Sequence, residues 1–579
     1  MNVIADTPFA LDATDRKCSR SDGLTDTPRG AKRLIQSLAC GLMTVMASAT
    51  LATAAEDNPA NWPVYHGTYK STRFSGLNSI NKSNVTRLKV AWIHQPGEIT
   101  GGLQATPIVI DGVLYYSSAN NKVQALDAGT GKELWRFQPK LDPVVNEIFF
   151  TASSRGVTVG LGKVFLATLD GRIIALDQKT GKEAWSTQLV ETRKQSGNNF
   201  TSPPALAGEV LAIAPTSGDS AQRGKIYGVD ANTGKKLWEF DTIKDDQKSW
   251  PGTSGNTGGG GGWLPGTYDR ETDTLYWGIG NPAPDYYGED RNGDNLYTDS
   301  VVALDPKTGR LKWHTQELPH DVWDFDSTYE TVLFERDGKK LLFHPTKAGF
   351  VWVMERDSGK LHNVWPFSET YNFVKTIDPK TGELIGRRDP VLGQETLICP
   401  WILGARSWNH GAYSPDTGLW YNNVMEACNV VVTAKQDPKK LGLTELYYGV
   451  ESAKMVPPPD RPASGRFEAR DPVSGKVKWS IPYAVPGLGC VLATAGGLVF
   501  NGDVFGTLNA YDADNGKVLW SFNMGSGVRG GIVSYAVNGK QYIVVSSGMY
   551  SHAVDFMPPV FPQIRDANGG AALIAFTLE

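Results

Sequence analysis

Two aspartates separated by a single aromatic residue, Asp324 and Asp326, are the residues of this sequence whose types and spacing most directly suggest chemistry. If residues 319–328 are extended, both carboxylates lie on one face, and Trp323 and Phe325 lie on the other. Two carboxylates that close repel each other unless a proton or a cation lies between them. A hard cation held by oxygen ligands is one such arrangement, and a solvated acidic loop is the alternative.

The segments that must position these carboxylates form a repeat. Strand-like residues precede most copies, as at residues 123–126, so each copy predicts a hairpin in which a glycine-containing turn joins two strands. The tryptophan begins the second strand and would be a large packing anchor. The pattern Asp-x3-Gly-x3-Trp occurs at Asp127–Trp135, Asp177–Trp185, Asp230–Trp238, Asp305–Trp313, Asp471–Trp479 and Asp512–Trp520, with weaker copies at residues 356–365 and 416–418.

The spacing of the copies predicts the fold class. The strong copies begin 50, 53, 75, 166 and 41 residues apart. A recurring interval near 40–50 residues indicates one four-stranded blade per repeat, and such blades close into a β-propeller. With the weaker copies included, we expect an all-β, eight-bladed propeller that forms a single domain over residues 56–579. Residues 62–75 are expected to join the last blade and to close the ring.

The net charge and the first 55 residues bear on the partners of the protein and on its cellular location. A formal net charge of -4, a pI near 6.1 and the lack of any Lys/Arg-rich run argue against a nucleic-acid partner. Arg29, Lys32 and Arg33 precede an apolar run over residues 34–51 that ends in small residues. Residues 1–55 therefore predict a signal peptide, with an over-long start, and a periplasmic chain without stable membrane insertion. A membrane anchor is the alternative.

Cysteine usage fits an exported chain. Of five cysteines, Cys18 and Cys40 fall in the predicted leader, and Cys399, Cys428 and Cys490 remain. Three is an odd number, so at least one is free or pairs between chains. The sequence contains no Cys-x-x-Cys-His, so we expect no covalently attached c-type haem, and no zinc-like Cys/His cluster occurs.

The repeats resemble the tryptophan-docking repeats of the quinoprotein alcohol dehydrogenases, the methanol and ethanol dehydrogenase-like family. These eight-bladed propellers carry pyrroloquinoline quinone (PQQ) and a metal ion on the axis, and the resemblance runs from about Trp62 to the C-terminus. It implies periplasmic oxidation of an alcohol to an aldehyde or ketone by metal-assisted hydride transfer to the quinone. Electrons would pass to an external acceptor such as cytochrome c. A non-catalytic envelope scaffold propeller and a divergent, apo-like quinoprotein are the alternatives, and a homodimer is left open.

The same resemblance implies a metal site. Asn281, within Gly-Asn-Pro-Ala-Pro, matches the family's amide ligand, and Asp324 matches both a metal ligand and the catalytic base. Asp219 stands where the family usually has a glutamate ligand. Asp326 matches an extra carboxylate of members that use a lanthanide, a larger and more highly charged ion. The metal is therefore expected to be Ca²⁺ or a lanthanide.

The resemblance also implies a set of quinone contacts. Trp263 follows five glycines and would lie flat beneath the quinone, and Lys347 would meet its reactive carbonyls. Gln104 stands where the family usually has a glutamate. The cofactor-binding residues implied in this way are Gln104, Arg155, Thr201, Thr216, Trp263, Lys347, Trp408 and Asn409, with Asp503 and Arg529 on loops of the last blade that reach the axis.

Three further expectations concern the surroundings of the site. Phe149 and Phe150 stand where many family members have two adjacent cysteines, so an aromatic wall could cover the quinone instead. Similar enzymes form a structural disulfide at the spacing of Cys399 and Cys428, which would leave Cys490 free. Insertions at residues 286–296 and 378–400 are expected to shape the mouth of the pocket, and the sequence does not identify the alcohol.

Overall fold

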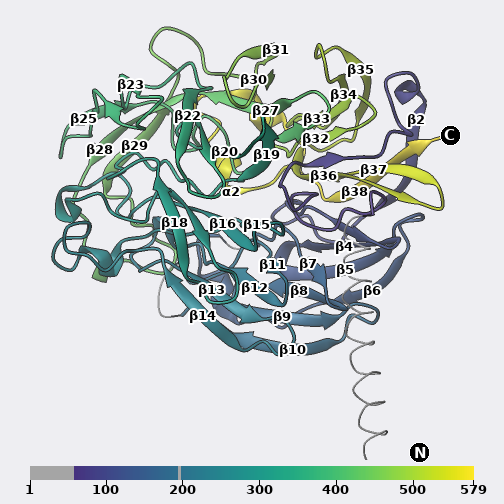
Figure 1. Ribbon diagram of the computed structural model, residues 1–579, viewed down its shortest axis with the longest axis horizontal. Helices are drawn as coiled ribbons and strands as arrows, with labels where there is room; N and C mark the ends of the chain where they lie inside the picture. Colours follow the sequence, from purple (N-terminus) through teal and green to yellow (C-terminus); the bar gives the residue numbers. More distant parts are fainter. Residues whose placement is uncertain (1–57, 151, 194–196) are drawn as a thin grey trace, which may run out of the picture. The chain divides into compact units, whose positions relative to one another are not determined.

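The computed structural model describes residues 58–150, 152–193 and 197–579, all of which belong to the unit Ala54–Glu579. Strands dominate these residues (Figure 1). Within the described part, eight sheets contain four or five strands each. The fold is therefore an all-β, propeller-like arrangement, as the repeats predicted. The predicted signal peptide, residues 1–55, lies outside the described residues.

One sheet illustrates the repeating unit. Its strands are β3 (Ile108–Ile110), β4 (Val113–Ser118), β5 (Lys122–Asp127) and β6 (Glu133–Phe137), and each pairs antiparallel with the next. Strands β4 and β5 are buried over nearly their whole length, whereas β6 has exposed residues at alternate positions. This difference is expected, because an outer strand is packed on one face and solvated on the other.

The remaining elements have the following bounds. Four further sheets follow sequence order: β7 (Thr158–Gly160), β8 (Lys163–Ala167), β9 (Arg172–Asp177) and β10 (Glu183–Gln188); β11 (Ala205–Ala207), β12 (Val210–Ile213), β13 (Lys225–Asp230) and β14 (Lys236–Asp241); β15 (Thr267–Asp269), β16 (Thr274–Ile279), β17 (Ser300–Leu304) and β18 (Leu311–Gln316); β19 (Val332–Arg336), β20 (Lys339–Pro345), β21 (Phe350–Glu355) and β22 (Leu361–Pro366). Three sheets combine distant segments: β26 (Ala412–Ser414), β27 (Leu419–Glu426), β30 (Ser464–Arg470) and β31 (Val477–Tyr483); β1 (Phe74–Ser75), β32 (Leu492–Thr494), β33 (Leu498–Gly502), β34 (Thr507–Asp512) and β35 (Val518–Asn523); β2 (Leu88–His94), β38 (Ala572–Leu578), β37 (Lys540–Ser547) and β36 (Val528–Val537). Smaller pieces are β23 (Thr376–Ile377) with β24 (Leu384–Ile385), β25 (Glu395–Ile398) with β28 (Cys428–Thr433) and β29 (Val450–Val456), the helix α2 (His552–Asp555), and the 3-10 turns η1 (Val85–Arg87), η2 (Ala119–Asn121), η3 (Pro143–Asn146), η4 (Ser217–Asp219), η5 (Ser254–Thr257), η6 (Glu289–Arg291), η7 (Pro438–Lys440) and η8 (Pro562–Asp566).

Each residue of the repeated motif has a structural task, as the turn after β9 illustrates. The Asp177 carboxylate accepts hydrogen bonds from the Thr180 amide at 2.9 Å and hydroxyl at 2.7 Å, which closes the turn. Gly181 has φ +69°, and a Cβ there would lie 2.4 Å from the Trp135 ring, so only glycine fits. Trp135 in turn donates from Nε1 to the Gln178 carbonyl at 3.1 Å. The tryptophan of one sheet therefore packs on the turn of the next.

The same contact recurs elsewhere in the unit. Each of these tryptophans joins its own sheet to a turn that lies 34 to 107 residues further along the chain. Such contacts bury large aromatic surfaces between neighbouring sheets and satisfy the indole N–H. The further pairs are Trp92 Nε1 with Ala128 O (3.1 Å), Trp238 with Pro306 O (2.9 Å), Trp313 with Arg356 O (3.0 Å), Trp365 with Pro472 O (3.0 Å) and Trp479 with Ala513 O (3.0 Å).

The N-terminal and C-terminal parts of the unit share a sheet, although not through the predicted segment. Strand β2 pairs antiparallel with β38, the last strand of the chain. The expectation that residues 62–75 would join the last sheet is wrong. Trp62 instead exchanges backbone hydrogen bonds with Val109, and β1 pairs parallel with β32 of the preceding sheet. In β2 more buried and more exposed side chains alternate, as expected for an outer strand of a sheet.

The cysteines are arranged as the resemblance implied. Cys399 and Cys428 form a disulfide with a Cα–Cα distance of 4.4 Å, and Cys490 is free and buried. The disulfide ties the start of β28 to the segment that follows β25. It therefore fixes the beginning of a loop that continues to Ile402 and Leu403.

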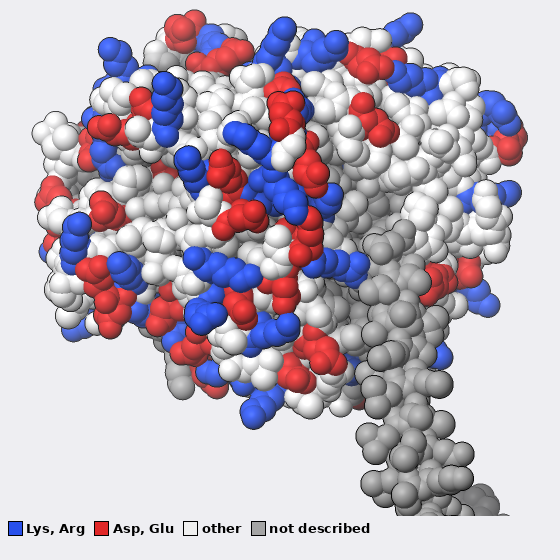
Figure 2. Space-filling model, in the orientation of Figure 1, with Lys and Arg blue, Asp and Glu red and all other residues white. Residues whose placement is uncertain are grey.

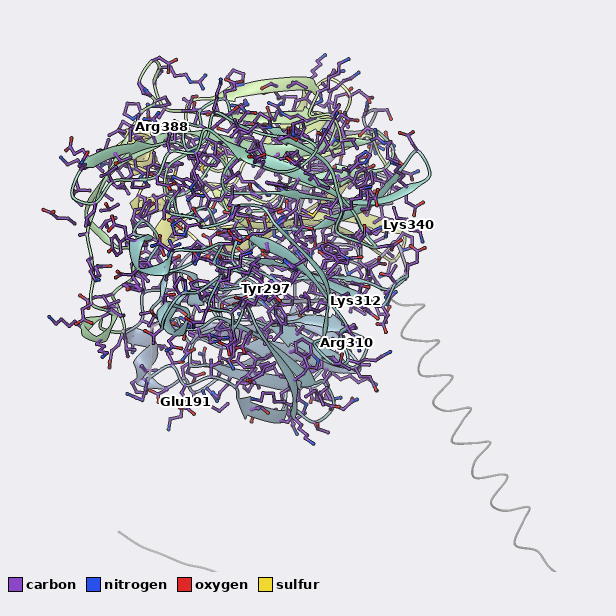
Figure 3. All side chains as sticks on the ribbon, turned by 60° about the vertical axis from the view of Figure 1, so that its left-hand side comes forward. Glu191, Tyr297, Arg310, Lys312, Lys340 and Arg388 are labelled. Atoms are coloured by element: carbon purple, nitrogen blue, oxygen red, sulfur yellow. A yellow bond between two sulfur atoms is a disulfide. The ribbon has the colours of Figure 1, made fainter. Side chains whose placement is uncertain are left out.

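The surface is charged with both signs. Lys and Arg residues are interspersed with Asp and Glu over the face shown in Figure 2. Exposed side chains of the strands contribute to this pattern, among them Lys312 of β18 and Lys340 of β20 (Figure 3). Lys340 forms an ion pair with Glu271. In the described part of the chain no helix combines the length and apolarity needed to cross a membrane.

Candidate functional site

A cavity of about 140 Å³ lies where loops from many sheets meet. Its walls come from segments as far apart in sequence as Gln104 and Phe556. This convergence is the property that lets a propeller build one site from many short loops. The cavity brings together the following residues that the sequence predicted for the site: Gln104, Arg155, Thr201, Thr216, Asp219, Trp263, Asp324, Asp326, Lys347 and Trp408.

The loop that carries the two central aspartates is held by a third one. The Asp321 carboxylate accepts hydrogen bonds from the backbone N–H groups of Trp323 and Phe325, both at 2.8 Å. Asp324 has φ +64°, so the loop turns sharply there and is not extended throughout, which was the condition for the shared face. The two faces nevertheless separate as expected. Trp323 and Phe325 are buried in an aromatic core, whereas Asp324 and Asp326 line the cavity.

Three carboxylates and one ammonium form the acidic end of the cavity. Oxygens of Asp219, Asp324 and Asp326 all lie within 4.8 Å of one another. Lys347 Nζ contacts Asp324 Oδ1 at 2.7 Å and Asp326 Oδ2 at 3.0 Å. One ammonium does not balance three carboxylates, so the acidic end carries surplus negative charge. A cation with hard oxygen ligands would relieve it.

The protonation equilibria reflect this crowding. Burial raises the pKa of Asp324 well above its ordinary value. Burial, followed by repulsion from Asp326, raises the pKa of Asp219 to about 7. Burial alone would lower the pKa of Lys347, but Asp324 and Asp326 outweigh it and hold that pKa well above its usual range. The acidic end therefore attracts positive charge, either protons or a metal ion.

Asn281 completes a donor set for a metal ion. Its Nδ2 donates to Asp285 Oδ1 at 2.8 Å, which fixes the orientation of the amide. Its Oδ1 is buried and has no hydrogen-bond partner among the described residues. A Cβ on Gly218 would lie 3.1 Å from this oxygen and 3.6 Å from Asp326 Oδ1, so both oxygens border the same small space. An unpartnered buried amide oxygen beside carboxylates fits a hard cation such as Ca²⁺ or a lanthanide.

Two indole rings flank a buried guanidinium on another wall of the cavity. The centre of the Arg155 guanidinium lies 5.1 Å from the Trp263 ring centroid and 4.7 Å from that of Trp408. Arg155 also donates from Nη1 to the Thr201 hydroxyl. Trp263 Nε1 donates to Asp326 Oδ1 at 3.2 Å, which joins this wall to the acidic end. The predicted aromatic floor and the predicted metal ligands therefore border one space.

Two buried arginines beside the cavity make no ion pair with a carboxylate in the part of the chain that the structure describes. They are Arg155 and Arg529, and Arg529 also packs over Trp408, at 4.7 Å. Burial lowers the pKa of Arg155 to about 10 and that of Arg529 to about 9. Buried guanidinium groups are normally paired. A flat, polycarboxylate ligand such as PQQ would supply the missing negative charge and would stack on the indoles.

Two of the predicted cofactor contacts, Thr216 and Asn409, bond to other residues, and of the two predicted loop residues Arg529 lines the cavity whereas Asp503 does not. Thr216 lines the cavity, but its hydroxyl donates to Asn199. Asn409 does not line the cavity among the described residues. Asn409 instead binds Arg529 through both ends of its amide. The Arg529 guanidinium donates to Asn409 Oδ1, and Asn409 Nδ2 donates to the Arg529 carbonyl at 2.7 Å. Asp503 closes a local turn through the amides of Phe505 and Thr507 instead of reaching the cavity.

The mouth of the cavity is built from segments other than those expected. Residues 286–296 and 378–400 contribute no lining residue, although Tyr286 Oη lies 3.5 Å from Asp324 Oδ2 behind the site. Sequence reasoning missed several lining residues: Tyr329, Ile402, Leu403, Tyr448, His552 and Phe556. None belongs to a motif, so only their meeting in space identifies them. For Tyr329 a signal existed, because it directly follows the acidic loop.

Comparisons with known proteins agree with this geometry. The family model described as PQQ, "Glucose/ethanol/alcohol dehydrogenase, beta-propeller domain", matches residues 62–377 and 460–543. The quinohemoprotein alcohol dehydrogenase ADH IIB of Pseudomonas putida is 35% identical over 519 residues, which cover 86% of this chain and 74% of that protein. The quinoprotein ethanol dehydrogenase of Pseudomonas aeruginosa is 33% identical, over 83% and 84% of the two chains. A solved europium-containing methanol dehydrogenase superposes with a TM-score of 0.83 at 28% identity, over 91% of this chain and 100% of that one.

Proposed function

The chain belongs to the family of PQQ-dependent quinoprotein alcohol dehydrogenases, and we propose that the acidic end of its cavity is the centre at which it oxidises alcohols. It is an oxidoreductase that depends on PQQ and on a metal ion, Ca²⁺ or a lanthanide. The residues that perform the reaction are our proposal, and they follow from the geometry of the cavity.

PQQ, when bound, supplies the chemistry by accepting a hydride from the alcohol carbon, and the metal ion supplies a Lewis acid beside it. Asp219, Asn281, Asp324 and Asp326 would hold the metal, because their oxygens border one space. Trp263 and Trp408 would stack on the flat cofactor, since both indoles line the cavity. The cofactor contacts would be completed by Arg155, Arg529, Thr201, Thr216 and Gln104, all of which line the cavity.

Asp324 is the proposed base. Its carboxylate lines the cavity, and its pKa is raised by burial, so it is better suited to accept a proton than an exposed aspartate. Lys347 lies 2.7 Å from it and would stabilise the carboxylate before the reaction and any negative charge that develops near the quinone carbonyls. Asp321 positions Asp324 indirectly, because it fixes the loop that carries it.

One observation carries the proposal: the acidic end, the indole floor and two unpaired buried guanidiniums border a single cavity. Each feature alone has a structural explanation. Together they match a ligand that is flat, carries several carboxylates and binds beside a metal ion. A non-catalytic scaffold propeller would have no reason to bring these groups to one place.

We extend the proposal to the finer architecture and to the partners of the enzyme. The eight large sheets would close as eight blades, supported by the pairing of β2 with β38 and by the recurrent tryptophan contacts between sheets. The enzyme would act in the periplasm, where its reduced cofactor would pass electrons to an external acceptor such as a cytochrome c. The disulfide between Cys399 and Cys428 is in keeping with an oxidising compartment.

The direct test is reconstitution. The purified metal-free protein is incubated with PQQ and either Ca²⁺ or La³⁺, and reduction of a dye is followed with a series of primary and secondary alcohols. We expect turnover only when quinone, metal and alcohol are all present. Substituting Asp326→Ser should impair activation by La³⁺ more than activation by Ca²⁺, because the larger charge needs the additional carboxylate. Failure of every alcohol with both metals, while PQQ binds, would contradict the proposed function.

A further inference from the structure

A second set of residues that line the cavity differs in chemistry from the acidic end. Besides the carboxylates and Lys347, the lining contains large apolar and aromatic side chains. The proposed mechanism assigns no task to them. We call this set the apolar wall, and its members are Phe149, Phe150, Ile402, Leu403, His552 and Phe556.

The aromatic members of the apolar wall come from two distant segments that meet at the cavity. The Phe149 ring stacks on the His552 imidazole, with centroids 5.1 Å apart and planes 29° apart. Phe150 packs edge-on against Phe149 at 5.0 Å. All three side chains are only half-buried, although aromatic rings of this size are usually covered. Partly exposed aromatic rings that line a cavity mark a surface for an apolar ligand.

The apolar wall is held in place from behind. Ser551, next to His552, accepts a hydrogen bond at 3.0 Å from Nε of Arg529, a residue of the cavity itself. Met557, next to Phe556, is buried in a hydrophobic cluster with Trp401, which also includes Leu403 as a partly buried member. Because both flanks of the segment are packed, the wall presents a defined surface and binds a ligand at little cost in ordering.

We propose that the apolar wall is the subsite for the substituent of the alcohol, and that it selects alcohols with an aryl group or a similarly bulky, flat apolar group. The inference rests on the proposed function, since it places the hydroxyl at Asp324. Because both sets of residues line the same cavity, a bound alcohol would hold its hydroxyl among the polar groups and its substituent among the apolar ones. A one- or two-carbon alcohol would leave the aromatic surface of Phe149 and Phe150 uncovered and would gain nothing from it.

The test compares two alcohols on the reconstituted holoenzyme. The ratio of kcat/KM for benzyl alcohol to kcat/KM for ethanol is measured in the native enzyme and in Phe149→Ala, Phe150→Ala and the double variant. The native ratio should exceed one, and the double variant should lower it by at least about tenfold, because lost apolar contacts in a pocket typically cost that much discrimination. Phe149→Leu and Phe150→Leu keep the apolar character and should lower the ratio less.

Tyr550→Ala is the matched control. Tyr550 is an aromatic residue two positions from His552, is 48% exposed and does not line the cavity, so its removal should leave the ratio unchanged. Thermal unfolding of each variant separates loss of folding from loss of selectivity, and the leucine variants keep the test valid if an alanine variant unfolds. A native preference for ethanol, or an unchanged ratio in the folded variants, overturns the inference. Binding of PQQ without turnover of either alcohol would instead contradict the proposed function itself.

Discussion

The same residue type has opposite properties in two regions of this molecule. In the repeat turns, Asp177 is exposed, and hydrogen bonds from the Thr180 hydroxyl and backbone lower the pKa of its carboxyl. At the acidic end of the cavity, burial raises the pKa of Asp324 well above its ordinary value. The turn aspartate is stabilised as an anion by donors within three residues. Asp324 depends on Asp219 and Lys347, which lie 105 and 23 residues away in the sequence. A structural aspartate is therefore defined by its neighbours in the chain, and the proposed catalytic one by its neighbours in space.

Replacing the two aspartates in turn tests this contrast most severely. Asp324→Asn should lower kcat by about 10⁴-fold, because an amide cannot accept the hydroxyl proton of the alcohol. Asp177→Asn, the matched control at a repeat turn, should leave kcat within about twofold, since asparagine also suits such turns. Dye-coupled steady-state kinetics on the PQQ- and metal-loaded enzymes provide the measurement. Substantial turnover in a folded, PQQ-loaded Asp324→Asn enzyme would remove this residue as the base.

The second prediction concerns stability and addresses the repeat region. Trp238→Ala should destabilise the protein by about 3–5 kcal/mol, because it leaves a cavity between two sheets and an unpaired Pro306 carbonyl. Its neighbour Leu237 is 45% exposed, so Leu237→Ala should cost little. Denaturant unfolding would measure both variants, and kcat per folded Trp238→Ala enzyme should stay near the native value. A strong loss of kcat without a loss of stability would contradict this prediction, because it would show that the contact between the two sheets affects the cavity directly.

The third prediction concerns the disulfide, which lies outside both the repeat turns and the acidic end of the cavity, and its expected effect is smaller. A Cys399→Ser/Cys428→Ser double variant opens a loop that spans 29 residues. Loop-closure entropy then predicts a loss of about 3–4 kcal/mol of stability. The midpoint of denaturant unfolding, compared with and without reductant for the native protein, measures the effect. A Cys490→Ser variant is the control, because Cys490 is free, and an equal loss in that variant would argue against an entropic origin.

The last prediction uses the raised carboxyl pKa values. In the metal-free protein the pKa of Asp219 is about 7, so below this pH the residue is largely protonated and must release its proton when a metal binds. Apparent affinity for La³⁺ or Ca²⁺ should therefore rise with pH by about tenfold per unit below about pH 7, and Asp324 adds to this slope. Calorimetric titrations in buffers of different ionisation enthalpy would count the protons. Asp219→Asn should reduce the slope, whereas a flat profile in the native protein would contradict the assigned environment.

Much of the fold could be predicted because its determinants are local. The Asp-x3-Gly-x3-Trp motif contains the turn acceptor, the glycine with positive φ and the packing anchor within nine residues, as at Asp177–Trp185. The motif therefore predicts hairpins, and its spacing predicts repeated sheets. The strand that joins the chain ends was misplaced. Residues 62–75 and 88–94 both contain strand-like residues, and only long-range pairing of β2 with β38 distinguishes them.

The candidate site was predicted where a resemblance supplied the residues, and missed where it did not. Asp219, Asn281, Asp324, Trp263 and Lys347 were placed in the site from motifs and do meet in one region of the structure. Trp408 and Asn409 were both predicted to line the site, but only Trp408 does, because adjacent residues in a chain usually point in different directions. The conformation of the acidic loop, for which the sequence offered only the condition of an extended stretch, depends on Asp321, whose carboxylate accepts backbone hydrogen bonds in a turn that no sequence periodicity indicates.

By itself the sequence determined the hairpins, the tryptophan anchors, the disulfide partners implied by resemblance, and which residues could bind a metal or a quinone. Only the tertiary structure decided the side-chain neighbours of Asp324, the unpaired state of Arg155 and Arg529, and the meeting of Phe149 with His552. The physical reason is range. Turns and strands depend on dihedral angles and contacts within a few residues, whereas burial, charge balance and cavity shape depend on residues from separate segments of the chain.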